Sequence, residues 1–204
     1  MKTKNLFIVA AFAVLLSACS QIFPPALYSP KAMSELTADL KKISENYIIE
    51  EVRVTEKEQL TSEFGYAQVF MRDKEGKQFE QMLYYGLGIP HNDPKPRTGY
   101  GTNRKEEPHA VNVEDIIKQN DNIEKYVEAA KLQINEEFEG EYKFESVTNL
   151  EFKADKEGAL QIRFCMNVTE KGNSTRREGG QMVTDYYELQ FNVDKDGNVT
   201  YEDD

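Results

Sequence analysis

Residues 160–169 alternate strictly between apolar and polar side chains. One set is Leu160, Ile162, Phe164, Met166 and Val168, and the other is Gln161, Arg163, Cys165, Asn167 and Thr169. Because successive side chains of a β-strand point to opposite faces, this period predicts a strand with one buried face and one bare face. Residues 182–193 predict a second such strand, with Val183, Tyr187, Leu189, Phe191 and Val193 on the buried side. The chain is therefore expected to build an antiparallel sheet covered on one side.

Helical periodicity precedes each group of predicted strands. Ser29 and Pro30 are typical of a helix start, and five apolar residues then follow at spacings of three and four: Met33, Leu36, Leu40, Ile43 and Tyr47. A second helical pattern covers residues 113–138 and breaks near Asn120, where Asp121 is the expected cap of a further helix. The other predicted strands cover residues 48–55, 64–72, 79–85, 142–154 and 199–201. Asp-Lys-Glu-Gly at 73–76 and 155–158, and Asp-Lys-Asp-Gly at 194–197, predict hairpin turns.

These elements predict an α+β fold with two helix-plus-antiparallel-sheet units in tandem, the helices packed on one sheet face. The first unit covers residues 30–86 and the second residues 112–204. Short matches between residues 43–47 and 134–138, and between 67–69 and 160–162, favour a duplication, although convergence of pattern explains them too. The layout is similar to exported proteins of the PepSY and β-lactamase-inhibitor-protein-like kind, a likeness of architecture that does not fix function.

The first 19 residues carry an export pattern. Lys2 and Lys4 precede an apolar run over residues 6–16, which is too short to span a membrane, and Leu16-Ser17-Ala18-Cys19 follows. This order resembles a bacterial lipobox; an ordinary secretory signal with an incidental cysteine is the alternative. The resemblance implies removal of residues 1–18, attachment of acyl chains such as palmitate to Cys19, and a lipid-anchored tether over residues 19–29.

The same resemblance carries an expected location. Ser20 is not the acidic residue that retains many such lipoproteins at the inner membrane, so the outer membrane is favoured. Residues 21–25 lack the acidic cluster that takes some lipoproteins to the cell surface, so the periplasmic side is favoured. The formal net charge is −11, and loss of the two signal-segment lysines leaves −13. A surface this acidic repels nucleic acid, so no nucleic-acid partner is expected. With Cys19 acylated, Cys165 has no cysteine to pair with.

The segment 87–111 is the most unusual stretch of the body. It is rich in proline and glycine, separates the two predicted units and contains both histidines. Long irregular segments in compact proteins are either functional or linkers. Arg97, Tyr100 and Arg104 form a candidate binding segment for an acidic or aromatic partner. Tyr186 adds an exposed tyrosine on the last long strand. A plain interdomain linker is the alternative.

Few residues favour catalysis. No serine-hydrolase, metalloprotease, nucleotide-binding or dinucleotide-binding motif is present. The set His91, Asp93 and His109 has zinc-ligand chemistry, but its spacing fits no zinc motif, so no metal and no cofactor are predicted. The sequence therefore predicts a lipid-anchored envelope protein that binds a protein or another envelope component. The alternatives are an envelope hydrolase with an unrecognised site, and a small-molecule or lipid-binding protein.

Overall fold

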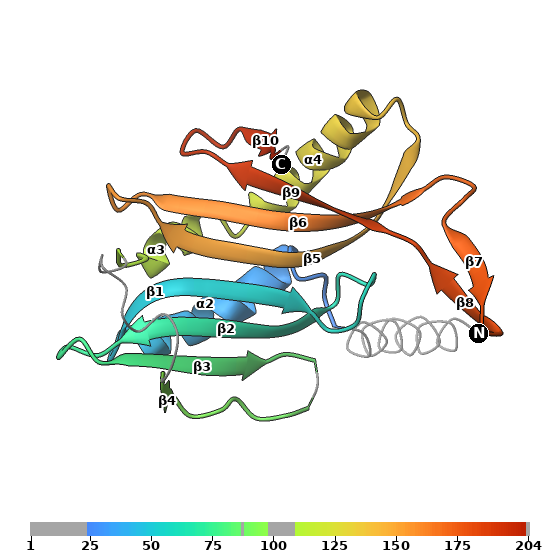
Figure 1. The fold of residues 1–204 in the computed structure, drawn as a ribbon. Helices are drawn as coiled ribbons and strands as arrows, with labels where there is room; N and C mark the ends of the chain where they lie inside the picture. The colour runs from blue at the N-terminus through green and yellow to red at the C-terminus, as the bar shows by residue number, and fades with distance from the viewer. Residues whose placement is uncertain (1–23, 87, 98–108, 203–204) are drawn as a thin grey trace, which may run out of the picture.

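A computed structural model describes residues 24–86, 88–97 and 109–202 (Figure 1). Its helices are α2 (Pro30–Ser44), α3 (Val113–Lys118) and α4 (Ile123–Glu137). Its strands are β1 (Ile48–Glu56), β2 (Phe64–Arg72), β3 (Gln78–Tyr84), β4 (Lys95–Pro96), β5 (Tyr142–Ala154), β6 (Leu160–Glu170), β7 (Thr175–Glu178), β8 (Gln181–Thr184), β9 (Tyr187–Val193) and β10 (Val199–Tyr201). Mixed helices and a large antiparallel sheet confirm the α+β class.

Eight of these strands form one antiparallel sheet in the order β10-β9-β6-β5-β1-β2-β3-β4. The pairing of β1 with β5, from Glu51 opposite Lys153 to Thr55 opposite Asn149, joins the two halves of the chain. Both edges of the sheet are short, since β4 has two residues and β10 has three. Short edge strands offer little template for pairing with other chains.

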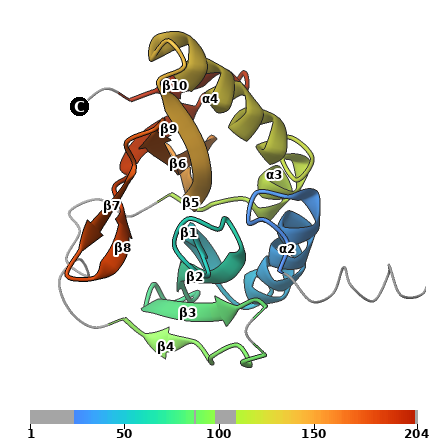
Figure 2. The same cartoon turned by 90° about the vertical axis from the view of Figure 1, so that its right-hand side faces the viewer.

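α2 begins at the expected residues, and the apolar stripes of α2 and α4 are buried. The Ser29 hydroxyl accepts a hydrogen bond from the amide of Ala32 at 3.3 Å, and Pro30 occupies the first turn of α2. The apolar stripes of α2 and α4 belong to the same hydrophobic cluster as Val52, Val54 and Phe164 of the strands. In Figure 2 the helices lie on one side of the sheet, and the β7-β8 hairpin lies on the other. Asp121 was expected to cap the second helix, but the N-cap of α4 is Asn122, which makes no side-chain capping bond.

The three predicted hairpin turns are confirmed. The Asp73 carboxylate accepts hydrogen bonds from the amides of Glu75 and Lys77, both at 2.9 Å. Asp155 and Asp194 repeat this arrangement in the β5-β6 and β9-β10 turns. Gly76 has a φ of 84°, a conformation that glycine adopts without steric cost.

The single strand predicted over residues 182–193 is wrong. Gln181–Thr184 leaves the main sheet as β8 and pairs with β7, and β9 begins only at Tyr187. The amide of Asp185 donates to the carbonyl of Ser174 at 2.8 Å, which closes the small hairpin. Asp185 interrupts the apolar alternation between Val183 and Tyr187, at the point where the chain changes its pairing partner.

The bare second face predicted for residues 160–169 is confirmed only at its start. Gln161 and Arg163 are exposed, whereas Cys165, Asn167 and Thr169 are buried. β5 has two register shifts beside this stretch, and side chains of β5 near these shifts cover it. The Asn167 amide donates to the Ser146 hydroxyl at 3.3 Å, and the Thr169 hydroxyl donates to the Glu145 carboxylate at 2.7 Å.

Candidate binding site

The sheet face opposite the helices carries a row of polar side chains across five strands. Facing residues in the register are Gln68 on β2, Arg53 on β1, Glu151 on β5, Arg163 on β6 and Asn192 on β9. Residues directly opposite one another on paired strands lie on the same sheet face. We call this surface the polar face; Figure 1 views it with the helices behind the sheet.

Opposite charges alternate at the centre of the polar face. The Arg53 guanidinium contacts Glu51 and lies 3.9 Å from Glu151, and Lys153 contacts Glu151 and lies 3.4 Å from Glu51. Burial raises the pKa of the Glu151 carboxyl, but the hydrogen bond and charge of Lys153 outweigh burial and hold that pKa below its usual range. The Glu151 carboxylate is therefore ionised near neutral pH and is compensated by Lys153 and Arg53.

Two adjoining hollows indent this face. The first has a volume of about 340 Å³ and is lined by residues that include Asn149, Cys165 and Gln190. The second, of about 460 Å³, lies beside the β5-β6 and β9-β10 turns and is lined by residues that include Gln161 and Asn192. Both hollows share Glu151 and Arg163. Amide, carboxylate and guanidinium groups within one trough suit a ligand surface that presents both donors and acceptors.

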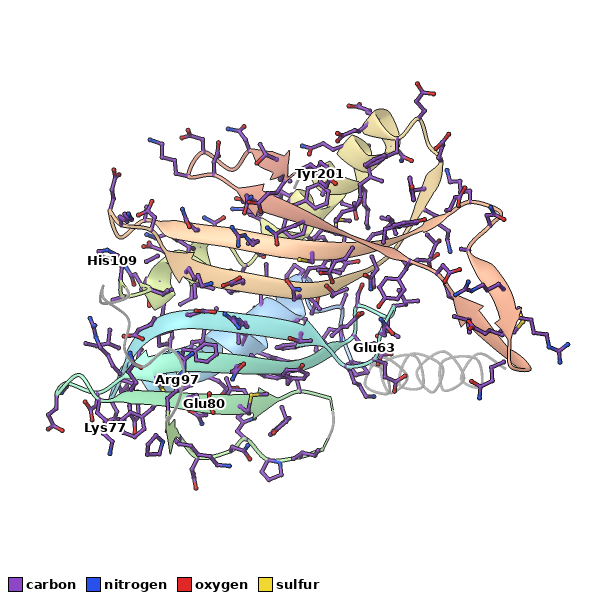
Figure 3. All side chains as sticks on the ribbon, viewed as in Figure 1. Glu63, Lys77, Glu80, Arg97, His109 and Tyr201 are labelled. Atoms are coloured by element: carbon purple, nitrogen blue, oxygen red, sulfur yellow. The ribbon has the colours of Figure 1, made fainter. Side chains whose placement is uncertain are left out.

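Arg97 belongs to the polar face. Its guanidinium carbon lies 4.5 Å from the ring centroid of Phe70, and that of Arg53 lies 5.2 Å from the same centroid. Phe70 is only 5% exposed, although it stands on the face opposite the core. Figure 3 shows Arg97 and Glu80 together at the β2-β3 part of this face. Arg97 thus combines a predicted binding role with a visible structural one.

Of the other predicted site residues, only Tyr186 belongs to the part of the chain that the structure describes. Cys19, Tyr100 and Arg104 lie outside the described residues. Tyr186 lies between β8 and β9 and not on a continuous strand, and its hydroxyl accepts a hydrogen bond from the side-chain amide of Gln59. In the sheet order β9 is far from β4, so Tyr186 and Arg97 do not share a local site.

Residues 88–97 of the irregular segment are attached to the sheet and do not form a plain linker. The amide of Asn92 donates to the carbonyl of Met82, and that of Arg97 to the carbonyl of Gln78, each at 3.0 Å. His91 Nδ1 accepts from the amide of Tyr84 at 3.0 Å, and its Nε2 lies 3.1 Å from Asp39. Both ring nitrogens are therefore engaged. Among the described residues no cluster of histidine, cysteine and carboxylate side chains is suited to hold a metal.

Sequence reasoning missed Arg53, Phe70, Glu151 and Asn192 as site residues. Each stands at an alternate position of a predicted strand, and only strand pairing brings them together.

The described part of the chain contains no helix that is both long and apolar enough to cross a bilayer. No protein-family model, curated protein or solved structure matches the chain.

Proposed function

We propose that this chain is a bacterial lipoprotein, held at the periplasmic side of the outer membrane by acyl chains on Cys19. The Leu-Ser-Ala-Cys sequence after a short apolar run supports the proposal. Two or three acyl chains give stable anchoring, whereas one chain is marginal. Mass spectrometry of the mature N-terminus should find acylated Cys19, and Cys19→Ala should release the protein into the aqueous fraction. An unacylated mature N-terminus would overturn the anchor.

The exported body acts as a non-enzymatic binding module, and the polar face is where its partner docks. One observation carries this proposal: the eight-stranded sheet has a broad face with an alternating row of Arg53, Glu151 and Arg163 beside two adjoining hollows. Paired charges on a surface give specificity through complementary potentials more than they give raw affinity. The partner is accordingly expected to be an envelope protein whose own surface presents both signs of charge.

A substitution that fills the trough tests this docking surface. Gln161 is exposed and lines the larger hollow, so Gln161→Trp places a bulky ring where the partner would enter. Asn135→Trp on the exposed side of α4 is the matched control. Affinity purification of the acylated protein from envelopes should recover a defined partner with wild type and the control, but not with Gln161→Trp. Equal recovery with all three proteins would contradict docking on the polar face.

The two halves are further proposed to be tandem copies of one unit in which a helical segment covers the strands that follow it. The sheet order supports this proposal, since β1 to β4 and β5, β6, β9 and β10 each run outward in chain order from the centre. The first strands of the two units, β1 and β5, meet there in antiparallel pairing. On this proposal, the β7-β8 hairpin is an addition to the second unit.

A further inference from the structure

The β7-β8 hairpin, Thr175–Thr184, stands away from the main sheet (Figures 1 and 2). We call it the arm. Its strands pair with each other and, within the described residues, with no strand of the main sheet. Every arm residue except Val183 is exposed. Because an isolated two-stranded hairpin is only marginally stable in water, an arm of this kind gains stability from a surface that it contacts.

The two faces of the arm differ in charge. On one face Arg176 lies 3.4 Å from Glu178 and 3.3 Å from Asp185, so its charge is compensated. The other face carries Thr175, Arg177, Met182 and Thr184, as the register requires. Met182 is 69% exposed and stands directly opposite Arg177. This second face contains no acidic residue, although the chain as a whole carries a formal net charge of −11.

Hydrogen bonds connect the root of the arm to the N-terminal segment of the described chain. Tyr186, just after the arm, bonds to Gln59 in the connection between β1 and β2. That connection also binds the N-terminal segment, since the amide of Leu27 donates to the carbonyl of Ser62 at 2.8 Å. In Figure 1 the arm extends past the end of the sheet at which the connection between β1 and β2 lies, and Figure 2 shows the arm on the side of the sheet opposite the helices. Pro24 is five residues after Cys19, so an extended tether reaches about 17 Å.

A second exposed apolar residue lies three positions along the chain from a glycine that contacts the N-terminal segment. Gly86 packs so tightly on Pro24 that a Cβ at that glycine would lie 2.6 Å from the proline ring. Ile89, three residues later, is 52% exposed. Met182, Tyr186 and Ile89 are exposed apolar or aromatic side chains, and Tyr186 bonds to the same β1-β2 connection that binds Leu27.

We infer that the Arg177–Met182 face of the arm contacts the anionic lipid surface of the membrane to which the protein is anchored. The inference rests on the proposed acylation of Cys19. Arginine binds lipid phosphates, and exposed apolar side chains bury themselves at the headgroup boundary. The anchor keeps the arm at high local concentration near the bilayer, so a weak contact is enough to orient the body.

The absence of tryptophan from the chain gives a clean test. Met182→Trp, in the acylated full-length mature protein, is reconstituted into vesicles of phosphatidylcholine with phosphatidylglycerol, some carrying bromine on the acyl chains. Leu132→Trp is the control, because Leu132 is 63% exposed on α4. Brominated lipid should reduce emission by about twofold or more at position 182 and leave position 132 unchanged. Arg177→Glu in the Met182→Trp protein should restore most of that emission.

Two results would overturn the inference. The first is emission at position 182 that responds to brominated lipid no more than emission at position 132. The second is quenching at position 182 that is the same with Arg177→Glu and in phosphatidylcholine alone, because anionic lipid would then have no part in the contact. Mass spectrometry of the same sample reports Cys19 acylation separately, so failure of the arm contact is distinguishable from failure of the anchor. A tryptophan at position 182 that stays in water would leave the arm to a protein partner.

Discussion

The guanidinium carbon of Arg97 lies 4.5 Å above the ring centroid of Phe70. Arg53 approaches the same ring, and together these cations leave only 5% of Phe70 exposed. An aromatic side chain on the polar face is therefore buried outside the hydrophobic core. This contact joins the sheet edge at β4 to the charged centre of the face.

Truncating Phe70 tests that arrangement. Phe70→Ala should lower the free energy of unfolding by about 2–4 kcal/mol, because it removes a buried ring and two cation contacts. Arg97→Ala should cost about 0.5–1 kcal/mol. Urea unfolding of both single variants and the double variant measures the coupling, with Gln68→Ala as a neighbouring control. Strictly additive single effects would show that Arg97 and Phe70 do not stabilise each other.

Asp39 should make the free energy of unfolding depend on pH in the acidic range. Burial raises the pKa of its carboxyl, but hydrogen bonds from Lys42 and His91 outweigh burial and hold that pKa below its ordinary value of 3.8. A carboxyl whose pKa is lowered on folding contributes stability above its unfolded pKa and loses it as pH falls through the folded value. Asp39→Ala should therefore cost about 1–2 kcal/mol near neutral pH.

The test follows the difference in unfolding free energy between wild type and Asp39→Ala as pH is lowered. This difference should shrink once the pH falls below 3.8, because protonated Asp39 loses its ionic partners. Glu35→Ala, at an exposed position on the same helix, is the control. A difference that stays constant down to strong acid would contradict the assigned contacts.

Cys165 should be unreactive in the folded protein. Burial, helped by the charge of Glu188, raises the pKa of its thiol to about 11, so little thiolate forms near neutral pH. The acylated mature protein should show one free thiol, which reacts with a thiol reagent only after denaturation. Ser34→Cys on the exposed side of α2 is the reactive control. Native labelling of Cys165 at the control rate would contradict its burial.

The raised pKa of the Cys165 thiol should also make the free energy of unfolding depend on pH in the alkaline range. The protonated thiol is favoured by folding, so its contribution is complete below the ordinary pKa of 9.0 and declines as pH rises towards 11. Cys165→Ser removes the thiol, so its free energy of unfolding should decline less than that of the wild type as pH rises from 9.0 towards 11. Urea unfolding of both proteins across that pH interval measures the difference.

Glu56 should be required for the connection between β1 and β2. Its carboxylate accepts hydrogen bonds from the amides of Leu60, Thr61 and Ser62 at 3.2, 3.1 and 2.9 Å. Glu56→Ala should cost about 2–4 kcal/mol, because it leaves partly buried amides without an acceptor. Hydrogen exchange at residues 60–62 should accelerate, while exposed Glu58→Ala should change it little. Unchanged exchange in Glu56→Ala would contradict this role.

The sequence predicted what depends on neighbours along the chain. The strand at Tyr142–Ala154 has the expected bounds, and Ser29 caps its helix, because both follow from local periodicity and local hydrogen bonds. Pairing between distant segments was not accessible in this way. Nothing near Arg53 indicates that Glu151 will face it, and the interruption at Asp185 does not indicate that β8 will pair with β7.

The candidate site shows the same division. Arg97 was selected because it is a cation in an unusual segment, and it does lie on the polar face. Its contact with Phe70 required β4 to pair along β3, with Glu80 opposite Lys95. Tyr186 was assigned to a continuous strand that does not exist, since β9 begins one residue later.

Photo-crosslinking in intact cells tests most directly whether the polar face binds an envelope partner. A benzoylphenylalanine is introduced at Gln161 on the polar face or at Asn135 on α4 of the acylated protein, with both positions exposed. If the polar face binds the partner, a discrete protein adduct should form from position 161 and be absent from position 135. Adducts from position 135 alone, or none from position 161 in cells where the acylated protein is present, would contradict it.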